Sequence, residues 1–130
     1  MRKNNMDKLD IPASAIQRCR SDKEIIELTI KQIIKDFALF GLQIDYDSAL
    51  GFSWQQVYLG LETQIRHLLE ASPAKILSLL YQIDIPDEKI MAQAEKQEKR
   101  QLSEVVSEMI MERELKKVLT RLYFKNPGRY

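Results

Sequence analysis

The sequence predicts an all-α fold, a bundle of four or five helices with a long C-terminal helix and a mobile N-terminal arm. Only four glycines and four prolines interrupt the 130 residues, which favours long helices over many short strands. Hydrophobic residues make up 45% of the chain and charged residues 30%, as is typical of a single globular domain. We expect a tail or loosely docked arm over residues 1–20, one helical domain over 21–125 and a short tail over 126–130.

The first helix is predicted over residues 22–40. Ser21 and Glu24 have the spacing of a capping box, in which two side chains satisfy free backbone N–H groups at a helix start. Apolar residues then recur on one helical face until Gly41, which suits a left-handed helix end.

The second helix is predicted over residues 54–70. Ser53 and Gln56 repeat the capping-box spacing ahead of the most regular amphipathic stripe in the chain. Trp54 and Tyr58 lie on that stripe, where aromatic side chains could anchor a partner. Helical spacing favours packing in the core for both.

Two short helices are predicted next. Ser72 followed by Pro73 is typical of a helix start, and Pro86 ends that helix and begins another with Asp87 and Glu88. The pair resembles a DNA-binding helix-turn-helix in outline. Acidic residues at the start of its second helix would face phosphates, which argues against that role.

The last helix is predicted over residues 101–124, and its apolar face changes side along its length. The first stripe consists of Leu102, Val105, Val106, Met109 and Ile110. The second stripe, turned by roughly half a revolution, consists of Met111, Leu115, Val118, Leu119 and Leu122. The intervening residues 112–114 are good helix formers, so we expect one continuous helix with two contact faces. We expect the second stripe to form an intermolecular contact, most simply self-association, or to hold the N-terminal arm.

Chemistry-bearing residues are sparse. His67 is the only histidine, and its helical position opposite the apolar stripe predicts an exposed surface residue. Cys19 has no second cysteine to pair with, so we expect an incidental or structural thiol. Phosphate-binding loops, zinc motifs and clustered metal ligands do not occur, and we predict no catalytic residue, metal or cofactor.

Asp45 and Asp47 resemble the first two ligands of a calcium loop. That loop then requires an oxygen ligand, a glycine and a carboxylate, where this chain has Ala49, Leu50 and Gln56. We therefore interpret the two aspartates as turn residues.

The net charge is +1, which provides no overall attraction to nucleic acid or anionic membranes. Residues 113–130 nevertheless carry six basic side chains and one acidic side chain. Arg113, Lys117 and Arg121 follow one another at four-residue spacing and form a possible anion contact. The alternative is a solvated helix face whose cations suit a helix C-terminus.

A cytoplasmic location is the default expectation. One cysteine cannot form an internal disulfide, and Asp7 and Asp10 interrupt what would be the apolar core of a signal peptide. No run reaches the roughly 20 apolar residues of a membrane span.

Two runs resemble segments of short helical bacterial proteins of unassigned function. They are residues 79–89, LLYQIDIPDEK, and residues 110–117, IMERELKK. Gln82 stands where these proteins lead us to expect a basic residue, and Pro86 where we expect a small polar one. The resemblance covers the second half of the chain and implies helical architecture, with neither a catalytic residue nor a ligand.

The functional hypothesis is a non-catalytic helical protein–protein interaction module that self-associates. Two alternatives stay open. One is a nucleic-acid-associated helical protein that uses the basic C-terminal end, and the other is an enzyme whose site is assembled only in three dimensions.

Overall fold

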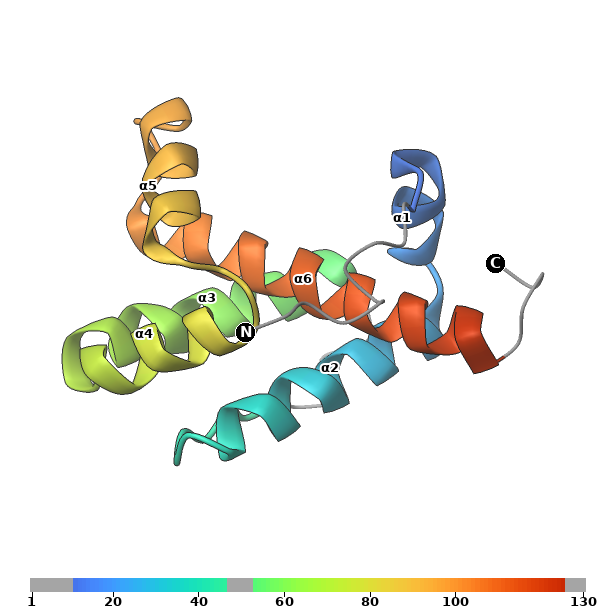
Figure 1. The fold of residues 1–130 in the computed structure, drawn as a ribbon, viewed down its shortest axis with the longest axis horizontal. Coiled ribbons are helices and arrows are strands. Elements are labelled where there is room, and N and C mark those ends of the chain that lie inside the picture. The colour runs from blue at the N-terminus through green and yellow to red at the C-terminus, as the bar shows by residue number, and fades with distance from the viewer. Residues whose placement is uncertain (1–10, 47–52, 126–130) are drawn as a thin grey trace.

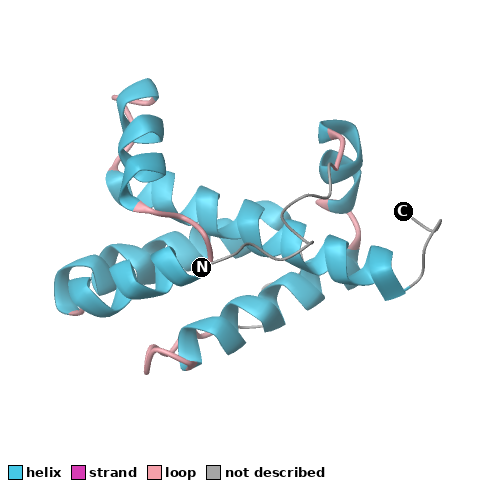
Figure 2. Cartoon of the chain, viewed as in Figure 1, coloured by secondary structure: helices cyan, strands magenta, loops and turns pink. Residues whose placement is uncertain are grey.

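A computed structural model of the chain describes residues 11–46 and 53–125, and over these residues the fold is all-α. The helices are α1 (Ala13–Cys19), α2 (Lys23–Ala38), α3 (Trp54–Ala71), α4 (Pro73–Gln82), α5 (Asp87–Lys96) and α6 (Leu102–Lys125). Figure 1 shows α6 passing through the middle of the molecule, with α2 and α3 packed along it. Figure 2 shows loops that join α1 to α2 and that link α3, α4, α5 and α6 in turn. The helix predictions for α2 to α6 are confirmed.

The boundaries of α2 differ slightly from the prediction. Asp22, and not Ser21, is the capping residue, because its Oδ1 accepts hydrogen bonds from the backbone N–H groups of Glu24 at 3.0 Å and Ile25 at 3.2 Å. A carboxylate also interacts favourably with the positive end of the helix dipole. Gly41 has φ +71° and ends the helix as predicted.

The starts of the next helices follow their predicted signals. Ser53 Oγ accepts a hydrogen bond from the backbone N–H of Gln56 at 3.1 Å, and Pro73 occupies the first turn of α4. The left-handed residue after α4 was not predicted from the sequence. Asp84 takes a left-handed conformation with φ 70°, the role that Gly41 has after α2. Aspartate tolerates this region better than most side chains do.

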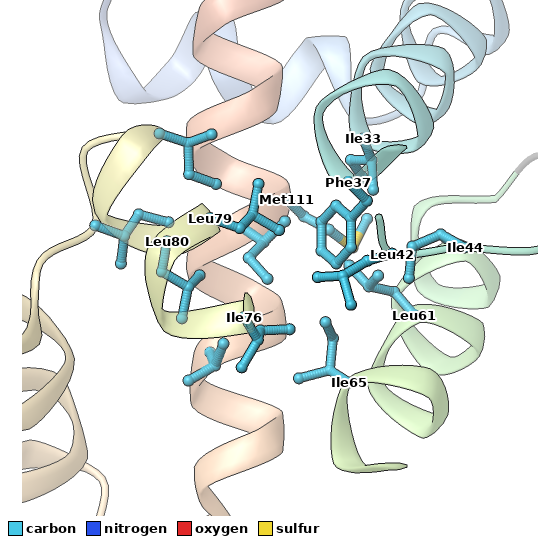
Figure 3. Packing of buried hydrophobic residues seen from close by; sticks show 14 of the residues in the cluster. Ile33, Phe37, Leu42, Ile44, Leu61, Ile65, Ile76, Leu79, Leu80 and Met111 are labelled. Atoms are coloured by element: carbon cyan, nitrogen blue, oxygen red, sulfur yellow. The ribbon is translucent and has the colours of Figure 1, made fainter. Parts of the chain in front are cut away.

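The main core lies between α6 and the helices that surround it. Figure 3 shows side chains from α2, α3, α4 and α6 converging on one cluster. Labelled members are Ile33, Phe37, Leu42, Ile44, Leu61, Ile65, Ile76, Leu79, Leu80 and Met111. Each such side chain contributes roughly 1.5–3 kcal/mol when it is fully buried, so this cluster is the main source of stability.

The last helix is continuous over 24 residues and is buried on both of its apolar sides. Val106 and Ile110 of the first stripe pack in the main core. Leu115 and Leu119 of the second stripe form a separate cluster with Ile25 of α2. The prediction of one continuous helix with two contact faces is confirmed, and both faces pack within the chain.

Helix α1 lies within the segment for which a tail or a loosely docked arm was predicted. Residues 1–10 lie outside the described residues, but Ala13–Cys19 form a helix that the sequence pattern did not reveal. Three partly buried side chains of the N-terminal segment pack against the cluster of Ile25, Leu115 and Leu119. They are Ile11, Ile16 and Cys19. No residue of α1 is fully buried, so its docking is shallow.

None of the helices in the described part of the chain combines the length and the apolar composition that crossing a bilayer requires.

Candidate functional site

The second stripe of α6 lies inside the chain. Met111, Leu115, Val118 and Leu119 are each at most 4% exposed, and Leu122 is partly buried. Met111 packs in the main core, whereas Leu115, Leu119 and Leu122 pack with Ile25 of α2 and with the N-terminal segment. A partner could reach the four buried side chains only by displacing those segments. Part of this stripe therefore contacts the N-terminal segment, and the intermolecular contact stays a prediction.

The basic stripe of α6 is also engaged within the chain. Its three cations donate hydrogen bonds to acceptors on other elements: Arg113 to the Ile83 carbonyl at 2.9 Å, Lys117 to Asp36 Oδ2 at 2.8 Å, and Arg121 to Gln32 Oε1 at 2.8 Å. Two of these acceptors belong to α2. An anionic ligand at this stripe would compete with contacts that join α6 to its neighbours.

The surroundings of His67 and Cys19 do not favour catalytic chemistry. His67 is exposed on α3, as its helical position predicted. Cys19 is partly buried, and burial, reinforced by the charge of Asp22, raises the pKa of its thiol. A raised pKa reduces the thiolate fraction that nucleophilic chemistry needs.

Of the two aspartates that resemble calcium ligands, the structure describes only Asp45. Asp47 lies outside the described residues. Asp45 accepts a hydrogen bond from Gln43 at 2.9 Å, and its backbone exchanges two hydrogen bonds with the side chain of Gln64, each at 2.8 Å. Across residues 11–46 and 53–125, no group of three or more His, Cys, Asp or Glu side chains is arranged to hold a metal ion.

Trp54 and Tyr58 pack against the main core, as helical spacing predicted. Their outer sides are covered by cations of the same chain. The Arg20 guanidinium lies 5.0 Å from the centroid of the Trp54 ring, and that of Arg100 lies 6.0 Å from the Tyr58 ring. Arg100 also donates a hydrogen bond to the Tyr58 hydroxyl at 2.7 Å. These contacts join the two rings to the fold, and both rings also line a hollow together with Arg20 and Arg100.

Two large hydrophobic side chains are exposed on α4. Its inner side is buried in the core, yet Leu77 is 44% exposed and Tyr81 is 74% exposed on its outer side. Ala74 and Ser78 lie on the same outer side at helical spacing and are also exposed. We call these four residues the α4 face. Beside it is a shallow hollow that Leu77, Ser78 and Tyr81 line together with Phe40 and other residues.

Sequence reasoning identified the buried side of α4 and missed its outer side. The available signal was charge, because Lys75 is the only charged residue among the ten residues of α4. A helix that is apolar on both sides normally has both sides covered.

The rim of the α4 face is charged at both ends. Lys75 lies in the first turns of α4, and Asp87 and Glu88 begin α5 and line the far end of the hollow. Leu39, which caps the end of α2, is 73% exposed. The described residues thus form a helical fold in which α4 carries a solvent-facing apolar face. No protein-family model, curated protein or solved structure matches the chain.

Proposed function

We propose that this chain is a non-catalytic protein–protein interaction module that self-associates through the α4 face. The observation that carries the proposal is that α4 has apolar residues on both sides and leaves one of those sides open to solvent. Single exposed leucines are ordinary. An apolar helix face beside a hollow is typical of a contact surface.

The occupant that fits best is a second copy of the chain. A two-fold contact requires one surface to complement itself. The α4 face has a small residue, Ala74, at one end, a large residue, Tyr81, at the other, and Leu77 and Ser78 between them. Antiparallel pairing of two α4 helices therefore places each tyrosine over the alanine of the other copy.

The charges at the rim favour the same arrangement. In the antiparallel pair, the N-terminal part of each α4 approaches the C-terminal end of the other. Lys75 of one copy then faces the acidic start of α5, Asp87 and Glu88, in the other copy. Two symmetry-related attractions result, although exposed pairs of this kind set orientation more than affinity.

The contact must extend beyond α4. A specific interface buries roughly 800 Å² on each partner, more than one ten-residue helix face supplies. Further apolar surface comes from Phe40 and Pro86, which line the hollow beside the face.

Replacing Leu77 and Tyr81 together with glutamate tests the proposal. Both side chains are exposed, so the fold should survive while two charges enter the dimer contact. We expect the wild type to have twice the chain mass in light scattering and the double variant to have the chain mass. Leu59→Glu is the matched control, because Leu59 is 52% exposed on α3 and lies outside the α4 face.

A charge exchange tests the orientation. Lys75→Glu should weaken the dimer by placing like charges together, and Lys75→Glu combined with Glu88→Lys should restore it. A wild type that stays monomeric at high concentration would contradict self-association. A heterologous protein that protects α4 amides from hydrogen exchange would then identify a different occupant of the same face.

A further inference from the structure

Polar side chains occupy the centre of the contact between α2 and α6. Gln32 and Asp36 of α2 are 6% and 5% exposed, and Glu114 of α6 is 0% exposed. Lys117 and Arg121 reach into the same contact from α6. We call these five residues the polar joint. Its placement among buried side chains makes every charge in it costly unless that charge is paired.

Asp36 is well supplied with hydrogen-bond donors. Gln32 Nε2 donates to Asp36 Oδ1 at 3.0 Å, and Lys117 Nζ donates to Asp36 Oδ2 at 2.8 Å. Burial raises the pKa of Asp36, but hydrogen bonds from Glu114 and Lys117, with the Lys117 charge, outweigh that effect and lower the pKa overall. Asp36 is therefore the ionised member of the joint.

Glu114 has the opposite surroundings. Among the described residues, no N–H or hydroxyl group donates a hydrogen bond to either of its carboxyl oxygens, and Lys117 Nζ lies 4.0 Å from Oε1. Burial raises the pKa of Glu114, and the neighbouring Asp36 carboxyl raises it further. Two carboxyl groups can share a hydrogen bond only when one of them carries a proton, and the donors on Asp36 leave that proton to Glu114.

We propose that the polar joint is a proton-linked contact, in which Glu114 holds a proton while α2 packs on α6 and releases it when α2 separates and water enters. The charged groups that act on Glu114 are Asp36 from α2, and Lys117 and Arg113 from α6. The negative charge of Asp36 keeps the proton in place, while the two cations weaken its retention. Separation of α2 is therefore favoured by a rise in pH, and any partner that displaces α2 binds with release of a proton.

The direction follows from proton counting. Burial, followed by the hydrogen bond and the charge of Asp36, raises the pKa of Glu114 from the ordinary glutamate value of 4.5 to about 9. Between these two values the packed joint holds one proton that the opened joint has lost. The equilibrium constant for opening therefore increases with pH, by at most about tenfold per unit.

Native-state hydrogen exchange of the α2 amides tests this linkage. After correction for intrinsic exchange rates, the opening constant of the wild type should rise by up to about tenfold per pH unit between pH 5 and 8. Glu114→Gln should abolish this dependence, because its amide remains neutral and can donate to Asp36. Glu112→Gln is the matched control, since Glu112 pairs with Arg20 at 2.7 Å outside the joint and should leave the dependence intact.

A direct titration of the wild type tests the proposal independently of any variant. The carboxyl carbon signal of Glu114 should stay in its protonated position through neutral pH. A midpoint in the ordinary glutamate range would overturn the proposal, as would a Glu114→Gln variant that keeps the wild-type pH dependence. If Glu114→Gln fails to fold, the wild-type titration alone decides between the two outcomes.

Discussion

Glu62 of α3 and Glu114 of α6 are both buried where α6 packs on another helix, yet their surroundings favour opposite charge states. Glu62 of α3 is 7% exposed and accepts hydrogen bonds from Arg66 Nη2 at 2.8 Å and from Ser103 Oγ at 2.5 Å. Hydrogen bonds from Arg66 and Ser103 lower the pKa of Glu62, whereas burial raises the pKa of Glu114. The comparison shows that donors, more than burial, decide whether a carboxyl in this fold is ionised.

The two contacts also differ in how α6 is attached. At the α3–α6 contact, Ser103 donates to an ionised carboxylate whose other partner, Arg66, lies at the surface. At the α2–α6 contact, the buried Glu114 receives no hydrogen bond from the described residues, and Lys117 lies 2.8 Å from Asp36 but 4.0 Å from Glu114. The first contact is satisfied at neutral pH, while the second depends on a proton. The α2–α6 contact is therefore the one that we expect pH to loosen.

Asp36→Ala should cause the largest loss in the free energy of unfolding. It leaves Lys117 and the Glu114 proton without their shared acceptor, and removing one partner of a buried pair costs about 3 kcal/mol. Urea denaturation at pH 7 measures the loss, with Asp36→Asn as the control because it retains one acceptor oxygen. A loss for Asp36→Ala no greater than that for Asp36→Asn would show that Asp36 is not the central acceptor.

The two buried glutamates should respond to glutamine with opposite signs. At pH 8, Glu114→Gln should raise the free energy of unfolding, since the folded wild type must retain a proton that the unfolded chain releases, at a cost of at most about 1.4 kcal/mol for each pH unit above 4.5. This gain should shrink as pH falls toward 4.5, the ordinary pKa of a glutamate carboxyl. Glu62→Gln should lower the free energy of unfolding by about 1 kcal/mol, because it weakens bonds to a charged acceptor. Thermal melts across this range measure both, and equal signs would contradict the comparison.

The sequence predicted the helical scaffold because its signals are local. Capping residues, prolines and apolar spacing located α2 to α6, and the half-turn between the stripes of α6 showed that two sides would be covered. Helix α1 escaped prediction because it is short and has no buried residue to produce a period. The left-handed Asp84 escaped because glycine is the usual signal for that conformation.

The candidate sites were harder to predict, for a different reason. Lys117 and Asp36 are 81 residues apart, so their pairing depends on how α2 crosses α6. Spacing alone placed Lys117 in a basic stripe and could not supply its acceptor. Glu114 sits among helix-forming charges in the sequence, and only the packing of α2 shows that it is buried. The α4 face could be defined only from the structure, which shows that the other side of α4 is buried in the core.

Ser103→Ala should sharpen the comparison with a smaller effect. It removes one donor from Glu62, which raises the pKa of that carboxyl toward its ordinary value, and it should cost about 1 kcal/mol at pH 7. The wild type gains stability from the lowered pKa of Glu62 above about pH 4.5, the ordinary glutamate value, and loses it as pH falls. The cost of Ser103→Ala should therefore diminish in acid. A cost that stays constant with pH would assign the effect to packing.

The smallest effect is expected for His67→Gln, which lies five residues along α3 from Glu62. His67 is exposed, and its side faces away from the apolar stripe that α3 packs on the core. Surface substitutions of this kind change the free energy of unfolding by at most about 0.5 kcal/mol. Urea denaturation of both variants, His67→Gln and Glu62→Gln, compares the loss in free energy of unfolding at an exposed and at a buried position of the same helix. A loss for His67→Gln as large as that for Glu62→Gln would mean that α3 as a whole, and not the buried carboxylate, carries the energetic difference between the two contacts.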